Sequence, residues 1–424
     1  MVLLIALLTL EIVLNVYRII TKSKQVYITL GLRLFTLLVL IILFTSNLFT
    51  WGFRYYAIVF VLAFCALFSV GKILIKHTTE YNPNVYKEVL KTIGMVVLIF
   101  LVLTPLLIFP EYQMIPTTGN YEVGTNVEFL TDTNRFESYY DGDGVNRNLT
   151  IQFWYPVSEN ETFPLIVFSH GSFGTRTSNE TLYRELASHG YVVCSIDHTF
   201  HSFYTVTDDG TLILMNMDYF GEVQRENARV NKEESLKLYQ KWMDIRTGDI
   251  NFVIDTIKNH QDDFAEGLID TTKIGVMGHS LGGSAALGIG RLRDDIGAVV
   301  ALESPFMCDI LDVDNGEFVF ETEEYPSAIL NIYSDSSWLH LGEWPQYGKN
   351  YELLSSMQED VFNVHIEGAY HLSLTDLSLV SPFLTFVLNG QASKLGTVDC
   401  LIRINEECLS FFDCYLKGKA TYST

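Results

Sequence analysis

Four long apolar stretches occupy the N-terminal quarter of this 424-residue chain. They cover residues 1–17, 25–46, 51–71 and 89–109, and each approaches the roughly 20 apolar residues that a helix needs to cross a bilayer. The first stretch contains Glu11, but no basic residue precedes it and no small-residue cleavage site follows, which favours a retained helix over a signal peptide. The sequence therefore predicts four transmembrane helices within residues 1–110.

Charge divides the chain into two parts of opposite sign. Residues 1–110 hold nine Lys or Arg and three Asp or Glu, a net of +6, and because the whole chain carries −22, residues 111–424 carry −28. An acidic balance of this size argues against nucleic acid as a partner. It also argues against docking onto anionic lipid by bulk charge, so any membrane association is expected to come from the N-terminal helices.

The basic residues between the apolar stretches predict an orientation. The second loop has only Arg54, whereas the first and third loops carry Lys22, Lys24, Lys72, Lys76, Lys87 and Lys91. The positive-inside rule places the first and third loops in the cytoplasm. Four spans would then leave both termini outside, and we expect a multi-pass cell-membrane protein whose larger part faces the extracytoplasmic side.

The sequence after the apolar stretches predicts a linker and one α/β domain. Residues 111–120 are rich in polar and turn-forming residues, and residues 121–424 alternate short β-rich runs with helical stretches. Near-continuous apolar runs that end in polar residues are typical of parallel strands buried on both faces. The predicted strands are Leu149–Tyr155, Leu165–Phe168, Tyr191–Ile196, Ile274–Met277, Ala298–Leu302, Ala328–Tyr333 and Phe362–Ile366. The predicted helices are Leu182–His189, Arg225–Asn259 and Gly282–Arg291. Such alternation indicates a mainly parallel sheet flanked by helices.

Cysteine spacing speaks against a metal site. The six cysteines form no Cys-x-x-Cys pair, so a zinc site is not expected, and nothing else in the sequence calls for a cofactor. Cys400, Cys408 and Cys414 are close in sequence, and one disulfide among them would be compatible with an extracytoplasmic location, without a unique pairing.

The segment Gly278-His279-Ser280-Leu281-Gly282 matches the pattern G-x-S-x-G between a predicted strand and a predicted helix. In that context the pattern predicts a nucleophile elbow, a sharp turn that exposes the serine at the carboxyl edge of the sheet. Glycines flank the serine because larger side chains would clash in so tight a turn. Ser280 is therefore the candidate nucleophile.

A serine nucleophile needs a base, and the base needs an acid that orients it. In folds with this elbow the chain order is Ser, then Asp or Glu, then His. His371 follows the last predicted strand and is the candidate base. Glu303 ends the strand after the elbow and is the favoured acid, whereas Asp335, at the end of the next strand, remains an alternative.

The negative charge that develops during attack on an ester requires two backbone N–H donors. One is expected from Leu281, at the start of the helix that follows the elbow. The other is expected from the loop after the predicted strand Leu165–Phe168, where Ser172 follows His170-Gly171.

Taken in order, several segments resemble the plasma-type platelet-activating factor acetylhydrolase family and its bacterial relatives, within the α/β-hydrolase superfamily. They are YEVGT, RNLTIQFWYP, FPLIVFSHG, LASHGYVVCSIDH, GHSLGG, the acid after AVVAL, and GAYH, and the resemblance as a whole covers roughly Tyr121–Leu416. The resemblance supports Glu303 as the acid, although the family typically has aspartate there, which keeps Asp335 open. It implies a metal-free, calcium-independent esterase that acts on phospholipids with short or oxidised acyl chains.

Two interpretations follow for the chain as a whole. The first is a membrane-anchored serine hydrolase of carboxylic esters with a lipid or small acyl ester as its substrate; a thioesterase or acyltransferase would use the same triad. The second is a membrane sensor or transporter-like protein with an inactive hydrolase-like domain. The aromatic residues Phe200, Phe203, Tyr204 and Tyr219 are candidates for an acyl pocket. The oligomeric state is not predicted by any feature of the sequence.

Overall fold

The computed structural model describes residues 2–21, 26–46, 52–74, 84–140, 144–259, 267–355, 358–419 and 421–423. Contacts divide the chain into two compact units, Met1–Tyr112 with Val380–Phe383, and Gln113–Leu379 with Leu384–Thr424. Three of the lysines used to predict the orientation, Lys22, Lys24 and Lys76, lie outside the described residues.

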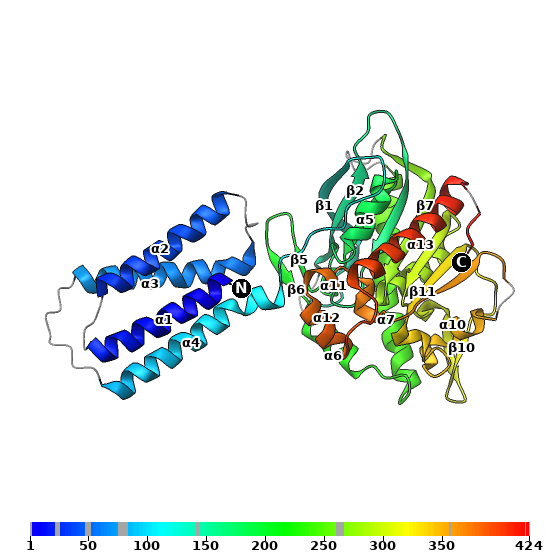
Figure 1. Ribbon diagram of the computed structural model, residues 1–424. Helices are drawn as coiled ribbons and strands as arrows, with labels where there is room; N and C mark the ends of the chain where they lie inside the picture. The colour runs from blue at the N-terminus through cyan, green and yellow to red at the C-terminus, as the bar shows by residue number, and fades with distance from the viewer. Residues whose placement is uncertain are drawn as a thin grey trace. The chain divides into compact units, whose positions relative to one another are not determined.

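Four helices make up the first unit (Figure 1): α1 Val2–Thr21, α2 Val26–Thr45, α3 Tyr56–Leu74 and α4 Val85–Ile108, with a short 3-10 turn η1 at Phe53–Tyr55. Among the described residues, only α4 is long and apolar enough to cross a membrane, with a mean hydropathy of 2.4 and 6% of its apolar window buried. The other helices contribute shorter apolar segments, Ile12–Thr21, Leu30–Val39 and Phe53–Phe68. The predicted four-span arrangement therefore stays a prediction.

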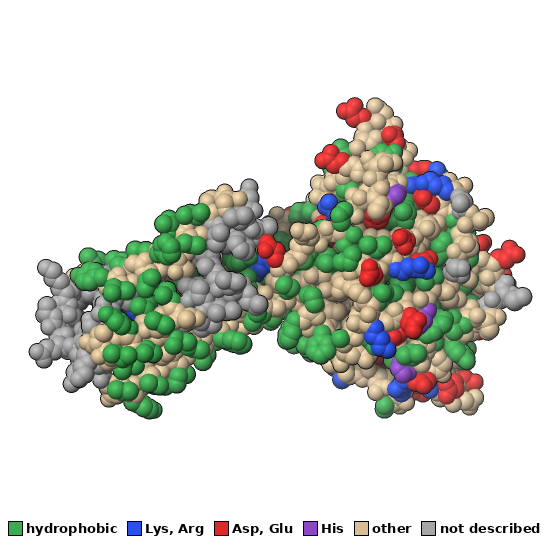
Figure 2. Space-filling view, in the orientation of Figure 1, with side chains coloured by type: hydrophobic (Ala, Val, Ile, Leu, Met, Phe, Trp, Pro, Cys, Tyr) green, Lys and Arg blue, Asp and Glu red, His purple; other side chains and the backbone are tan. Residues whose placement is uncertain are grey.

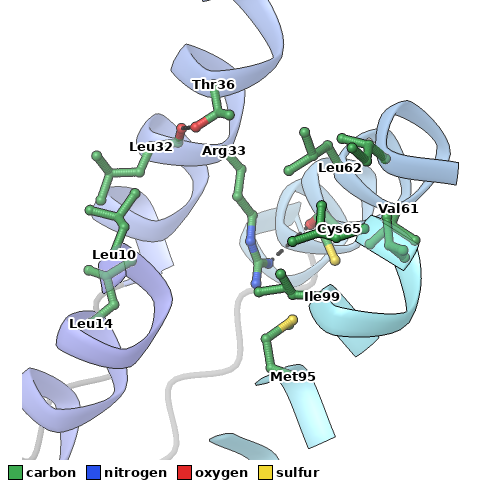
Figure 3. A pocket seen from close by; sticks show the side chains of 13 residues that line it. Leu10, Leu14, Leu32, Arg33, Thr36, Val61, Leu62, Cys65, Met95 and Ile99 are labelled. Carbon is green, nitrogen blue, oxygen red and sulfur yellow. Dashed lines mark hydrogen bonds between the residues drawn. The ribbon is translucent and has the colours of Figure 1, made fainter. Parts of the chain in front are cut away.

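Apolar side chains dominate the surface of these helices, whereas charged side chains gather on the second unit (Figure 2). Phe60, Leu67 and Leu101 are among the large apolar residues that remain exposed on α3 and α4. A cavity of about 50 Å³ lies among the four helices (Figure 3), and Arg33 from α2 reaches across it to donate a hydrogen bond of 3.3 Å to the Cys65 carbonyl.

An eight-stranded sheet organises the described part of the second unit, in the order β1-β2-β4-β3-β7-β8-β11-β12. Strand β2 is antiparallel to β1 and to β4, and all other neighbours are parallel. The strands are β1 Val123–Phe136, β2 Asn146–Pro156, β3 Phe163–Ser169, β4 Val192–Asp197, β7 Ile269–His279, β8 Ile296–Leu302, β11 Ala328–Ser334 and β12 Val361–Ile366. Two small hairpins accompany the sheet: β5 Tyr204–Val206 with β6 Leu212–Leu214, and β9 Ile310–Asp314 with β10 Glu317–Phe320.

Helices cover both faces of the sheet, because its central strands are apolar on both sides. In β3, Leu165 and Val167 pack with α7 and α8, whereas Ile166 and Phe168 pack with α5 and α13. The helices are α5 Glu180–Ser188, α6 Met217–Arg225, α7 Lys232–Lys258, α8 Leu281–Leu292, α9 Asp335–Trp338, α10 Gly348–Leu353, α11 Leu377–Val380, α12 Pro382–Asn389 and α13 Thr397–Lys417. Short 3-10 turns are η2 Met307–Asp309, η3 Pro345–Tyr347 and η4 His371–Leu374.

The predicted mainly parallel sheet is confirmed, and all seven predicted strands are present: six are longer than predicted, and β4 is shifted by one residue from the predicted Tyr191–Ile196. The edge strand β1 was not predicted, because its sequence VGTNVEFLTDTNRF mixes polar and apolar residues at a half-exposed edge. The single helix predicted over Arg225–Asn259 is wrong at its start. Helix α6 ends at Arg225, and Asn231 caps a new helix by accepting a hydrogen bond from the Glu234 backbone at 3.1 Å.

No disulfide forms at the end of the chain. No disulfide joins Cys400, Cys408 and Cys414, which lie on the single helix α13. At about 1.5 Å of rise per residue, their separations of six and eight positions put the thiols farther apart than a disulfide allows. The disulfide that the sequence left possible among them is therefore not formed.

Candidate active site

Ser280 occupies a strained turn between β7 and α8. Strand β7 ends at His279 and α8 begins at Leu281, so Ser280 is the only residue between them. Its φ of 54° and ψ of −125° are rare for a residue with a side chain, and its N–H donates a 2.8 Å hydrogen bond to the Leu302 carbonyl on β8. The Ser280 side chain is half-buried, so a reactant can approach it.

The glycines around Ser280 are required by close backbone packing. A Cβ on Gly278 would lie 2.4 Å from the Gly282 carbonyl carbon, and one on Gly282 would lie 2.0 Å from the Ser169 carbonyl oxygen. Neither position tolerates a side chain, because the clash is with backbone. The pattern G-x-S-x-G therefore has the steric cause that the sequence predicted for it.

The loop after β3 lies directly against the candidate nucleophile. A Cβ built on Gly171 would be 3.2 Å from Cβ of Ser280. The next residue, Ser172, accepts a hydrogen bond of 2.9 Å at its Oγ from the buried hydroxyl of Tyr219. The loop His170–Ser172, called the oxyanion loop below, and the first residue of α8, Leu281, are thus close to Ser280, as the proposed oxyanion donors must be.

His371 begins the turn η4 and lies on the other side of the elbow. Its carbonyl accepts a hydrogen bond of 3.1 Å from Nε2 of His279, and the two imidazole rings are 4.6 Å apart. Its N–H is held by Ser336 Oγ at 3.0 Å. Burial lowers the pKa of the imidazole to about 4, so His371 is neutral and able to act as a base at pH 7. Within the described residues its ring makes no hydrogen bond to Ser280 or to a carboxylate.

Glu303 carries a buried carboxylate with one oxygen available. The residue follows β8 with a φ of 55° and is 1% exposed. Its Oε2 accepts a hydrogen bond from the Ser334 N–H, whereas Oε1 has no partner among the described residues. Burial raises the pKa of this carboxyl to about 7, an effect that the hydrogen bond from the Ser334 N–H partly offsets. An acceptor of this kind suits a donor such as the His371 imidazole.

Asp335, the alternative acid, is engaged elsewhere. Its Oδ1 is 2.8 Å from Nε2 of His365, and its Oδ2 accepts a hydrogen bond of 3.2 Å from the Gly368 N–H. The indole of Trp338 stacks on the same imidazole, with the ring centres 4.8 Å apart. Since both carboxylate oxygens of Asp335 already have donors, the geometry favours Glu303 as the acid.

A hydrogen-bonded Ser–His–Asp chain, separate from the candidate triad, lies in the core and was not predicted. The Ser169 hydroxyl is 2.8 Å from Nε2 of His198, and Nδ1 of His198 is 2.8 Å from Asp249. All three residues are fully buried, so no substrate reaches this serine, and the chain is structural. Ser169 and His198 end neighbouring strands, a position that hinted at proximity, but the partner on α7 had no signal in the sequence.

The four aromatic residues proposed for an acyl pocket differ in how exposed they are, and the acyl pocket stays a prediction. Tyr219 is fully buried behind the oxyanion loop and stacks on His201 at 3.8 Å. Phe203 and Tyr204 are exposed on the β5 side, and Phe200 has a positive φ of 68°.

No group of three or more His, Cys, Asp or Glu side chains in the described chain is arranged to hold a metal ion.

The parallel sheet, the strained serine after β7 and the glycine-containing loop after β3 define an α/β hydrolase. A solved ferulic acid esterase from Streptomyces cinnamoneus shares this fold, with a TM-score of 0.54 and 19% identity over 73% of this chain and 94% of that one. The family model described as platelet-activating factor acetylhydrolase, isoform II, matches residues 145–423, and the chain belongs to that family.

Curated relatives agree with this assignment. A platelet-activating factor acetylhydrolase from Cavia porcellus is 26% identical over 286 residues, which are 62% of this chain and 59% of the relative. One from Canis lupus familiaris is 29% identical over 291 residues, with the same coverage. Cutinase 2 from Thermobifida cellulosilytica is 26% identical over 35% of this chain and 42% of the relative. The chain thus spans about three fifths of the length of the first two.

Replacing each candidate acid by the amide of the same shape removes its charge and should show which of the two is the acid. Glu303→Gln should lower kcat by about 10³–10⁴-fold, because the imidazolium formed during attack loses its counter-charge. Asp335→Asn removes the charge beside His365 and should leave kcat within a few-fold of wild type. Steady-state kinetics on both folded variants decides, and the opposite order of losses would assign the acid to Asp335.

The pKa values also predict a pH dependence. Glu303 must be ionised to stabilise the imidazolium, and its pKa is raised to about 7, so kcat/KM should fall as the pH drops through about 7. His371, with a pKa lowered to about 4, stays neutral over that range. A pH profile of Glu303→Gln should lack this limb in its residual activity. An unchanged limb in the variant would assign the proton to another group.

Proposed function

We propose that the chain is a membrane-associated serine hydrolase of carboxylic esters. The observation that carries this proposal is the strained Ser280 turn beside the oxyanion loop, where a Cβ on Gly171 would lie 3.2 Å from Cβ of Ser280. A strained backbone at a serine is retained where it serves a function. Membership of the acetylhydrolase family and the similarity to cutinases support the same chemistry.

The reaction would proceed by acyl transfer. His371 takes the proton of Ser280 as Oγ attacks the ester carbonyl, and Glu303 stabilises the imidazolium that forms. The N–H groups of Ser172 and Leu281 receive the oxyanion. His371 then gives its proton to the leaving alcohol, which leaves an acyl-enzyme on Ser280, and water activated by His371 releases the carboxylic acid and restores the serine.

The proposed substrates are esters with short acyl chains, including acetylated glycerophospholipids. The names of the family and of its mammalian relatives supply this substrate class. Apolar helices in the same chain would keep the active site near lipid, which raises the effective concentration of lipid esters without charge attraction. The proposed mechanism uses only protein groups, so no metal is required.

An ester profile tests the proposed function. The purified full-length chain should hydrolyse p-nitrophenyl acetate and butyrate, and an acetylated glycerophospholipid in mixed micelles, faster than long-chain esters, with no loss in EDTA. Ser280→Ala should lose about 10⁴-fold or more in turnover while remaining folded. Folded wild-type protein that turns over no ester would reject the proposal and favour a sensor with an inactive hydrolase-like domain. Activity abolished by EDTA and restored by a metal would also reject it.

The N-terminal unit is proposed to anchor the chain in the cell membrane. Helix α4 supports this directly, because it is long and apolar and only 6% of its apolar window is buried. We propose the division predicted from the sequence, with spans near 1–17, 25–46, 51–71 and 89–109, a linker at 111–120 and a hydrolase domain at 121–424. The lysine distribution supports an extracytoplasmic hydrolase domain.

The orientation has a direct test. Protease added to intact cells should cut or release the hydrolase domain, because the predicted topology exposes it outside. A cytoplasmic marker protein should stay intact in the same sample, which controls for lysis. Full protection of the domain in cells, with cutting only after lysis, would reverse the proposed orientation.

A further inference from the structure

A buried arginine holds the oxyanion loop from behind. Arg246, on α7, is fully buried. Its Nη1 donates a short hydrogen bond to the carbonyl of His170 and a second one, of 3.3 Å, to Oγ of Ser169. Its Nε donates to Nδ1 of His201 at 3.2 Å. Three of its contacts are thus to residues at the end of β3 or in the segment after β4, and all of its acceptors are neutral.

The charge of Arg246 is not neutralised by a direct partner. Among the described residues, none of the ion pairs includes it. Asp249, three positions further along α7, is taken by Arg147 at 2.6 Å, Arg135 at 2.9 Å and His198 at 2.8 Å. The Nη2 group of Arg246 has no hydrogen-bond partner in the described chain. Burial of a guanidinium without an ion pair and with one unpartnered nitrogen lowers the stability of the fold. This cost indicates that Arg246 has a role beyond packing.

The loop that Arg246 contacts is fixed at successive peptide groups. The carbonyl of Gly171 accepts hydrogen bonds from Nδ1 of His170 at 2.6 Å and from the N–H of Gly174 at 3.0 Å. In a planar trans peptide the N–H points away from the carbonyl, so a fixed Gly171 carbonyl also fixes the direction of the Ser172 N–H. Arg246 fixes the preceding carbonyl, that of His170. The donor proposed for the oxyanion is therefore aimed by contacts on its buried side.

We propose that Arg246 is a positioning residue for ester hydrolysis, which holds the His170–Gly171 peptide so that the Ser172 N–H faces the oxyanion. This inference rests on the proposed function. Arg246 would act indirectly, through its contact with the oxyanion loop, and it touches no reacting atom. Because the oxyanion exists only in the transition state, loss of Arg246 should lower kcat and leave KM nearly unchanged. A purely structural arginine would instead affect stability without this split.

Full-length Arg246→Met and Arg246→Lys variants test the proposal, with a p-nitrophenyl butyrate assay and a thermal melt for each. Arg246→Met should lower kcat by about 10–100-fold with KM within about twofold. A misplaced oxyanion donor lowers the rate by at most as much as the complete removal of that donor. Arg246→Lys keeps one charged donor and should recover part of that loss. The rate of Ser280 labelling by a fluorophosphonate should fall in parallel.

Arg291→Met is the matched control. Arg291 forms a 2.8 Å ion pair with Asp309 and makes no contact with the oxyanion loop among the described residues. The substitution should lower the melting temperature and keep kcat. If Arg246→Met does not fold, Arg246→Lys decides, with kcat expected about tenfold lower at unchanged KM. Wild-type kcat in a folded Arg246 variant overturns this inference alone. Absence of ester turnover in the folded wild type overturns the proposed function, and this inference with it.

Discussion

The strained backbone of Ser280 sets the geometry of the whole site. Its left-handed φ of 54° costs about 1–3 kcal/mol, which the neighbouring packing must offset. The turn is held by the hydrogen bond to Leu302 on β8 and by the approach of Gly282 to the end of β3. The register between β7 and β8 pairs His279 with Leu302, so the residue after Leu302, Glu303, is brought to the elbow by the same strand pairing. One set of contacts therefore supports the proposed nucleophile and places the proposed acid.

Two buried ionisable residues of opposite charge, Glu303 and Arg246, contact segments next to the elbow. Glu303, on the side of His371, keeps one carboxylate oxygen without a partner in the described chain. Arg246, behind the oxyanion loop, keeps a positive charge with neutral acceptors. Attack on an ester creates positive charge on the imidazole and negative charge on the oxyanion. The buried pair thus matches the charge separation of the transition state, in a region where water does not screen it.

The sequence predicted those parts of the fold and site that depend on local patterns. Buried runs such as PLIVFSHG identify central strands, and the glycines around Ser280 report a steric need that the backbone contacts bear out. Parts that depend on partners distant in sequence were missed. Strand β1 is stabilised by its pairing with β2 rather than by an apolar pattern, and Arg246 and Asp249 read as ordinary charged residues of a helix. Likewise, the sequence could not favour Glu303 over Asp335 by geometry, because it does not show that His365 lies within hydrogen-bond distance of the Asp335 carboxylate.

The central claim is that Ser280 forms a covalent acyl intermediate. The most direct measurement is peptide mapping by mass spectrometry after the full-length protein reacts with a fluorophosphonate. The proposed mechanism predicts a single adduct on the peptide that contains Ser280, blocked by prior incubation with a short-chain ester and absent in Ser280→Ala. An adduct on a different serine, or equal labelling of Ser280→Ala, would contradict it.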